Sequence, residues 1–193
     1  MVEKEEIREQ IIEASRQIFS RFGFKKTTMD EIAQGVRKGK SSIYYYFSSK
    51  EDIYKAVIEK EAALIRDELA SAIGKVDDPI EKLKTYVTVR MRTFHAMVNF
   101  YEAIKNEFLT HLDFINKIRE KYDKEEMQMV ESFLKDGVNR NQFIVDNTEL
   151  AAIAIVTAMK GLEIPLFKYN NQLNWDERID HLLNVLLYGI VRR

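Results

Sequence analysis

The side chains best suited to bind a ligand gather in one stretch, Thr27 to Lys50, which reads TTMDEIAQGVRKGKSSIYYYFSSK. Its candidate contacts carry hydroxyl or ammonium groups: Thr27, Thr28, Lys40, Ser41, Ser42, Tyr44, Tyr45, Tyr46 and Lys50. Such groups donate hydrogen bonds to phosphate oxygens and to the edges of bases. A row of tyrosines or a basic run, taken alone, is more often an ordinary surface feature. Their combination within one short stretch favours contact with nucleic acid.

The distribution of charge supports the same interpretation. Residues 21–50 contain seven basic and two acidic side chains, a local net charge of +5. The rest of the chain contains 23 basic and 29 acidic side chains, a net charge of -6, so the total of -1 hides the asymmetry. A compact basic patch on an acidic chain predicts a small head that meets phosphates, carried by a body that does not.

Two short helices joined by a turn are expected to position these side chains. Thr28 can cap the first helix, with Glu31 three residues later completing a capping box, and Gly35 is expected to end it. In the second helix, Ile43 and Phe47 share one face at a spacing of four residues. A helix anchored on one face with hydroxyls on the others is typical of a recognition helix in a helix-turn-helix unit.

Longer helices are predicted on both sides of this pair. Apolar residues at helical spacing indicate a first helix over about residues 4–22, and Gly23 is a suitable left-handed stop. A fourth helix over about residues 50–73 can be capped by Ser48 or Ser49. We expect residues 1–50 to form a helix-turn-helix DNA-binding domain, with the fourth helix connecting it to a helical body over residues 51–193.

The remainder also reads as helical, because the chain has few glycines and prolines and almost no alternating strand pattern. Five further helices are predicted, over about residues 79–97, 99–111, 114–137, 148–167 and 174–191. Asp78 is expected to cap the first of them, Gly137 to end the third, Asp146 or Asn147 to cap the fourth, and the last to open at Asn174. The expected fold is all-α, a helical bundle of about nine helices.

The last two predicted helices are apolar on several sides, which suggests a second buried surface. The simplest explanation is a homodimer interface formed by Ile155, Met159, Leu162, Leu183, Leu186 and Leu187. The alternative is that both helices lie in the middle of a monomeric bundle.

Aromatic residues concentrate in the middle helices, with several methionines nearby. They are Phe94, Phe100, Tyr101, Phe108, Phe114, Tyr122 and Phe133. Adaptable apolar side chains of this kind suit a cavity for a hydrophobic ligand, and they equally suit an ordinary core. Glu107, His111 and Asp113 could hold a metal, although a surface or capped histidine is the commoner case.

Composition and missing motifs exclude other classes of protein. The absence of cysteine excludes disulfides, thiolate metal sites and cysteine nucleophiles. The sequence has no glycine-rich phosphate loop, no serine nucleophile elbow and no convincing triad, so we expect neither catalysis nor a cofactor. The N-terminus is charged and no apolar run approaches the length of a membrane span, which favours the cytoplasm.

The first fifty residues resemble the DNA-binding domain of TetR-type transcriptional repressors. The residues that carry the resemblance occur in order and without a gap: Ile11, Ala14, Ile18, Phe19 and Gly23, then Thr27, Thr28, Ile32 and Ala33, then Tyr44, Tyr46, Phe47, Lys50 and Glu51. One departure is the turn, where Arg37-Lys38-Gly39 replaces the usual Gly-Val-Ser. Gly35 or Gly39 should then supply any left-handed residue, and contact of Arg37 and Lys38 with DNA is left open.

The resemblance implies a role for each candidate contact. Thr27 and Thr28 would bind a phosphate through hydroxyls and backbone N–H groups, whereas Tyr46 and Lys50 would each bind another phosphate. The recognition helix would enter the major groove with Lys40, Ser41 and Ser42, and Tyr44 and Tyr45 would reach bases or sugar-phosphate.

The resemblance further implies a homodimeric, ligand-responsive regulator, expected to be a repressor. It would bind a pseudo-palindromic double-stranded DNA operator and be released by a small apolar effector bound in the C-terminal domain. The alternative is a similar DNA-binding protein without a small-molecule inducer, which responds to a protein partner or occupies chromosomal sites.

Overall fold

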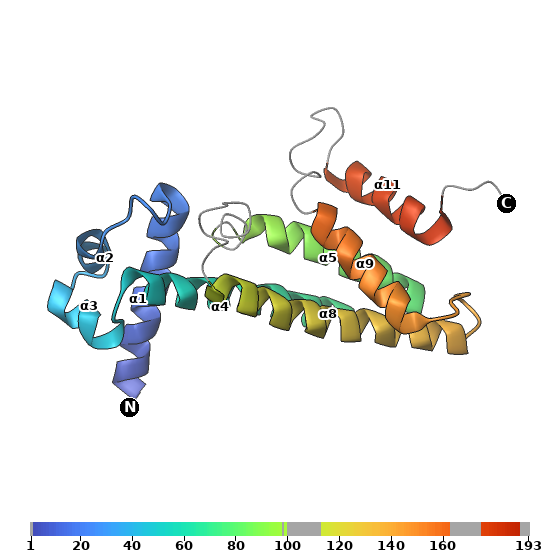
Figure 1. Cartoon of the computed structure of the whole chain (residues 1–193), viewed down its shortest axis with the longest axis horizontal. Helices are drawn as coiled ribbons and strands as arrows, with labels where there is room; N and C mark the ends of the chain where they lie inside the picture. The colour runs from blue at the N-terminus through green and yellow to red at the C-terminus, as the bar shows by residue number, and fades with distance from the viewer. Residues whose placement is uncertain (1, 98, 100–112, 163–174, 190–193) are drawn as a thin grey trace. The chain divides into compact units, whose positions relative to one another are not determined.

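The computed structural model describes residues 2–97, 99, 113–162 and 175–189. These residues contain eight helices and no strand, which confirms the all-α prediction (Figure 1). The helices are α1 (Val2–Phe22), α2 (Met29–Gly35), α3 (Lys40–Tyr46), α4 (Lys50–Ile73), α5 (Pro79–Ala96), α8 (Asp113–Asn139), α9 (Thr148–Leu162) and α11 (Trp175–Tyr188). The helix predicted at 99–111 lies outside the described residues. No helix within them combines the length and hydropathy of a membrane span.

The chain divides into two compact units. The first comprises Met1–Leu64 and Met97–Ile118, and the second comprises Ile65–Ala96 and Arg119–Arg193. Helix α4 contributes its first fifteen residues or so to the first unit and its last turns to the second. Its N-terminus is capped by Ser49, whose hydroxyl oxygen accepts a hydrogen bond from the Asp52 amide at 3.0 Å.

In the first unit, α1, α2 and α3 lie together at the start of α4 (Figure 1). Each of the four helices contributes a completely buried isoleucine, among them Ile11, Ile32, Ile43 and Ile53. Beside them, the Tyr54 ring contacts Phe19 edge-on, with 5.1 Å between ring centres, and Phe24, with 4.7 Å. This apolar centre fixes the two short helices, which are too short to be stable alone.

The second unit is a bundle of α5, α8, α9 and α11 with a polar layer inside it. The Arg90 Nε on α5 donates to the Glu126 carboxylate on α8 at 2.7 Å, and the Tyr86 hydroxyl donates to the same oxygen at 2.9 Å. Lys160 on α9 forms an ion pair with Asp123 on α8. These pairs bind three helices to one another by charge as well as by apolar packing.

The C-terminus of α8 differs from the prediction that Gly137 ends it. Gly137 lies inside the helix, which continues to Asn139, and Asn141 is the residue with a positive φ of 57°. A Cβ atom at Gly137 would lie 2.0 Å from the Phe143 ring. The glycine is therefore required because the chain after the helix folds back onto it, not because the helix stops there.

Polar caps mark the other helix boundaries. The Asp78 carboxylate accepts from the Ile80 and Glu81 amides at 3.0 Å each, as predicted for α5. Asn147 caps α9 by accepting from the Leu150 amide at 2.9 Å, which decides between the two candidates. Helix α11 is described from Trp175, and it ends at Tyr188 instead of near Val191, because Gly189 turns left-handed with a φ of 72°.

Candidate nucleic-acid interface

The start of α2 has the predicted capping box. The Thr28 hydroxyl oxygen accepts from the Glu31 amide at 3.3 Å, and the Glu31 carboxylate accepts from the Thr28 amide at 2.7 Å. The same carboxylate also accepts the Thr28 hydroxyl proton at 3.0 Å. These reciprocal bonds fix where α2 begins and hold the exposed Thr28 side chain against its own helix.

Helix α3 presents a polar outer surface on an apolar base. Ile43 is fully buried and Phe47 is 5% exposed, which confirms the predicted underside. On the opposite faces, Tyr44 is 47% and Tyr45 67% exposed, and Ser41 is also exposed. Large aromatic side chains at the surface of so small a unit are available to bind a partner.

A four-residue turn, 36–39, joins α2 to α3, and Arg37 is its left-handed residue, with a φ of 57°. This corrects the expectation that a glycine would serve: Gly39 is extended, with a φ of -68°, and Gly35 has no positive φ. Hydrogen bonds from the Arg37 amide to the Gln34 carbonyl and from the Lys38 amide to the Ala33 carbonyl, 3.0 Å each, hold the turn.

Gly35 is required for close packing between α2 and α1. A Cβ atom there would lie 2.8 Å from the Ile18 Cδ1 atom on α1. Its lack of a side chain lets α2 pack closely on α1, which sets the position of the whole helix pair.

Thr27 lies inside the first unit, where it is 1% exposed and its hydroxyl donates to the Gly23 carbonyl at 2.9 Å. This corrects the implied contact between the Thr27 hydroxyl and a phosphate, because a buried hydroxyl cannot reach one. Thr27 instead closes the turn that follows α1. This turn begins at Gly23, which has a φ of 79°.

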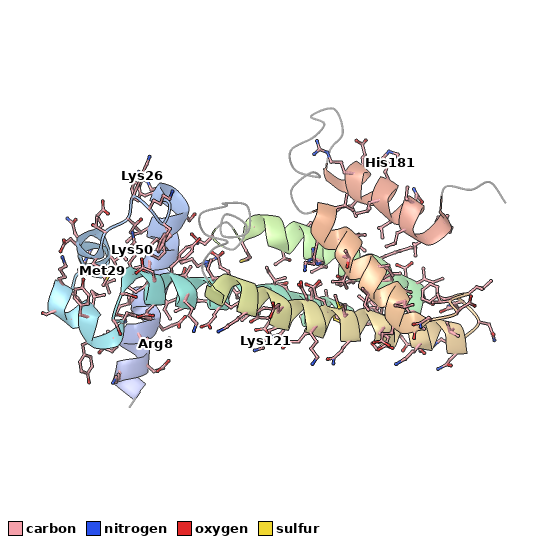
Figure 2. All side chains as sticks on the ribbon, viewed as in Figure 1. Arg8, Lys26, Met29, Lys50, Lys121 and His181 are labelled. Atoms are coloured by element: carbon pink, nitrogen blue, oxygen red, sulfur yellow. The ribbon has the colours of Figure 1, made fainter. Side chains whose placement is uncertain are left out.

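Lys50, at the start of α4 (Figure 2), is tied to the same loop. Its ammonium donates to the Thr27 carbonyl at 2.8 Å and to the Phe24 carbonyl at 2.9 Å, and it lies 4.5 Å from the centre of the Phe24 ring. An ammonium group has three protons, so two are used within the protein. Lys50 therefore connects α4 to the loop before α2, whatever its contact with DNA.

Lys40, the first residue of α3, forms an ion pair with Asp30 of α2 at 2.9 Å, and both side chains are exposed. The hydrogen bond from the ammonium to the Asp30 carboxylate raises the pKa of Lys40. The lysine is thus fully charged at neutral pH, and an exposed pair of this kind is weak enough for a phosphate to compete with it.

Sequence reasoning missed two side chains of α1 that reach α3. The Lys4 Nζ lies 4.7 Å from the centre of the Tyr45 ring, and the Arg8 guanidinium carbon lies 5.1 Å from the centre of the Phe47 ring. Their spacing of four residues was the available signal, but acidic neighbours cancel their charge in a regional count.

Of the candidate ligand-binding aromatic residues, the structure describes the side chains of Tyr122 and Phe133. Tyr122 is half-buried and Phe133 is 5% exposed. The others lie outside the described side chains: Phe94, Phe100, Tyr101, Phe108 and Phe114. The possible metal ligands Glu107, His111 and Asp113 lie outside them too, and the described part of the chain contains no metal-binding cluster.

Among the candidate interface residues, Met159 and Leu183 are buried within the protomer, at 0% and 8% exposed. Their side chains belong to the protomer's own core, and their part in a dimer interface stays a prediction. Ile155, Leu162, Leu186 and Leu187 are half-buried. The exposed apolar side chains on the same two helices are Leu150 and Ile153 of α9 and Val185 and Tyr188 of α11.

Comparison with known proteins finds a family model that matches this helix pair and its surroundings. Residues 11–57 match the family model for bacterial regulatory proteins of the tetR family. The HTH-type transcriptional regulator QacR of Staphylococcus aureus is 21% identical over 90% of each chain.

Solved structures agree along nearly the whole length. A transcriptional regulator from Cytophaga hutchinsonii is 28% identical, with a TM-score of 0.75 over 93% of this chain and 94% of that one. The transcriptional regulator FadR from Bacillus subtilis in complex with stearoyl-CoA has a TM-score of 0.73 at 19% identity, over 94% of this chain and 98% of that one.

The segment that matches the family runs from the middle of α1 into α4, so it contains the helix pair, its turn and the exposed face of α3. The likeness in fold extends through the second unit as well. Residues 11–57 therefore match the DNA-binding domain of the tetR family, and the chain as a whole is similar to TetR-type transcriptional regulators.

Proposed function

We propose that the protein is a homodimeric, ligand-responsive repressor that acts in the cytoplasm. The observation that carries this proposal is the exposed hydroxyl face of α3, anchored from below by Ile43 and Phe47. Each copy presents α3 to one major groove, and two copies bind successive grooves of a pseudo-palindromic operator about 34–36 Å apart. Residues 1–50 form the DNA-binding domain, and residues 51–193 form the regulatory and dimerisation domain.

Direct contacts to DNA come from the outward faces of α3. Lys40, Ser41 and Ser42 enter the groove, while Tyr44 and Tyr45 reach bases or sugar-phosphate. Phosphate contacts come from Tyr46, from Lys50 through its remaining donor, and from the backbone at Thr28. Serine and tyrosine hydroxyls can form hydrogen bonds with several different base edges. Part of the sequence preference therefore rests on thymine methyl groups and DNA shape.

Exposed apolar residues on α9 and α11 support dimerisation of the second unit. Leu150 is 62%, Ile153 38%, Val185 53% and Tyr188 67% exposed, which leaves hydrocarbon in water unless another surface covers it. On α9, Ala154, Ala158 and Gly161 are exposed as well, and such small residues let a second helix approach closely. The revised interface consists of these residues with the half-buried Ile155, Leu162, Leu186 and Leu187.

The effector is a small molecule with a long apolar part, bound in the second unit. The support is the run of aromatic residues from Phe94 to Phe133, and the similar fold of the FadR structure that contains stearoyl-CoA. A ligand that binds better when α4 is displaced shifts the population towards a spacing of heads that does not fit the operator. The alternative is a DNA-binding protein that has no small-molecule inducer. Such a protein would respond to a protein partner or occupy chromosomal sites constantly.

Selection of bound DNA from a random pool tests this function. The purified full-length protein should recover two related half-sites in inverted orientation, one helical turn or a multiple apart. Recovery of a single half-site would contradict the dimer, and recovery of no preferred sequence would contradict a specific regulator.

A further inference from the structure

We propose that the first turns of α1 belong to the DNA interface, with Lys4 as a phosphate contact held in place by the Tyr45 ring. The proposal rests on the proposed role of α3 in DNA binding. Lys4 and Arg8 lie one turn apart on the same face of α1, and each places its cation over an aromatic ring at α3 or directly after it. The two cations therefore join α1 to the helix that meets DNA.

The Tyr45 ring is held from two sides. The Lys4 ammonium lies 4.7 Å from its centre, and the Tyr46 ring meets it edge-on with 5.0 Å between centres. A cation is attracted to the face of an aromatic ring, and perpendicular rings are a favourable pair. An exposed side chain that is ordered before binding loses less conformational entropy when it meets DNA. Lys4 is thus a positioning residue for Tyr45.

The charge of Lys4 is also available to a phosphate. Among the described residues no carboxylate pairs with Lys4, whereas Arg8 lies 3.7 Å from the Glu5 carboxylate. Arg8 in addition stands over the Phe47 ring, so its cation is shared between a carboxylate and an aromatic ring of the protein. Of the two, Lys4 is the one that adds positive charge at the outer edge of α3.

The ligand of this site is a phosphate of the duplex backbone beside the groove that α3 enters. A phosphate contact carries no sequence information. Removal of the Lys4 charge should therefore weaken binding to every duplex and make it less dependent on salt, with little change in sequence preference.

Fluorescence anisotropy with a labelled duplex of random sequence tests the proposal in the full-length protein. The variant Lys4→Gln is compared with wild type between about 50 and 200 mM salt. Lys121→Gln is the matched control, because the Lys121 Nζ on α8 lies 5.7 Å from the Tyr122 ring in the second unit (Figure 2). Lys4→Gln should lower the magnitude of the log–log salt slope by about 0.9 for each phosphate that Lys4 neutralises in the wild type. Lys121→Gln should coincide with wild type.

A double-mutant cycle separates the charge from its positioning. If Tyr45 and Lys4 act together, Lys4→Gln combined with Tyr45→Leu weakens binding less than the product of the two single effects. A purely multiplicative result would overturn the positioning role, and a Lys4→Gln slope equal to that of Lys121→Gln would overturn the phosphate contact. Absence of binding by wild type to any duplex would instead defeat the proposed function, and the inference with it.

Discussion

The Arg16 Nε atom on α1 lies 3.0 Å from the Glu61 carboxylate on α4, and the Glu61 side chain is 1% exposed. The Asn99 side-chain amide donates to the same carboxylate oxygen at 2.8 Å and to the Arg16 carbonyl at 3.0 Å. A buried carboxylate is tolerated only when it is paired and hydrogen-bonded. The Glu61 carboxylate on α4 therefore binds both Arg16 of α1 and Asn99.

Arg16→Ala should destabilise the first unit. The substitution removes the Arg16 cation from the buried Glu61 carboxylate, at a cost on the order of 3 kcal/mol in the free energy of unfolding. Urea denaturation followed by tyrosine fluorescence measures the change. Arg66→Ala is the control, because Arg66 pairs with Asp67 on the exposed surface of α4 and should have little effect. Equal stability of the two variants would show that the buried pair is not structural.

Thr28→Ala should weaken the start of α2 by about 1 kcal/mol, because it removes both the cap and the partner of Glu31. Thr28→Ser keeps a hydroxyl and should retain most of the stability. Hydrogen exchange of the α2 amides reports the local effect. Indistinguishable exchange in the two variants would mean that packing on α1, not the cap, sets where α2 begins.

The turn offers a test in which two substitutions remove the same charge. Arg37→Val places a β-branched residue at a φ of 57° and should cost about 1–2 kcal/mol, whereas asparagine tolerates this conformation well. Thermal unfolding should therefore separate Arg37→Val from Arg37→Asn. If DNA affinity falls equally in both, Arg37 contributes charge to the interface, and if it is unchanged in Arg37→Asn, the side chain has no contact.

Helix caps and the underside of α3 could be predicted because their chemistry is local. Thr28 with Glu31, Asp78 with its two amides and Ile43 with Phe47 each involve residues within four positions of one another. Spacing alone identifies such pairs.

Contacts between distant residues could not be predicted in this way. Lys50 binds a carbonyl 26 positions away, and Gly35 and Gly137 are required by Ile18 and Phe143. From the sequence alone, Lys50 is identified only as a cation, and Gly35 and Gly137 only as residues that end helices. Only the packed structure shows that the lysine ties down a loop and that each glycine makes room for a neighbouring side chain.

Charged substitutions on α9 and α11 test the proposed dimer. Ile153→Glu and Val185→Glu change exposed side chains, so each should give a folded monomer with much weaker operator binding. Analytical ultracentrifugation measures the mass. Leu183→Glu is the contrast, since Leu183 is 8% exposed and a buried charge should unfold the second unit. A dimer that survives both surface substitutions would place the interface elsewhere.

The exposed face of α3 is proposed to read DNA, and Tyr44→Ala is the substitution that probes this role. Tyr44 is 47% exposed and its substitution leaves the buried Ile43 and Phe47 in place. The measurement is the ratio of affinities for the selected operator and for a scrambled duplex at one salt concentration. We expect the ratio to fall by about tenfold or more, the effect of removing one base contact, while the circular dichroism spectrum and dimer mass stay unchanged. An unchanged ratio in a folded dimer would contradict the assignment of α3 as the reading helix.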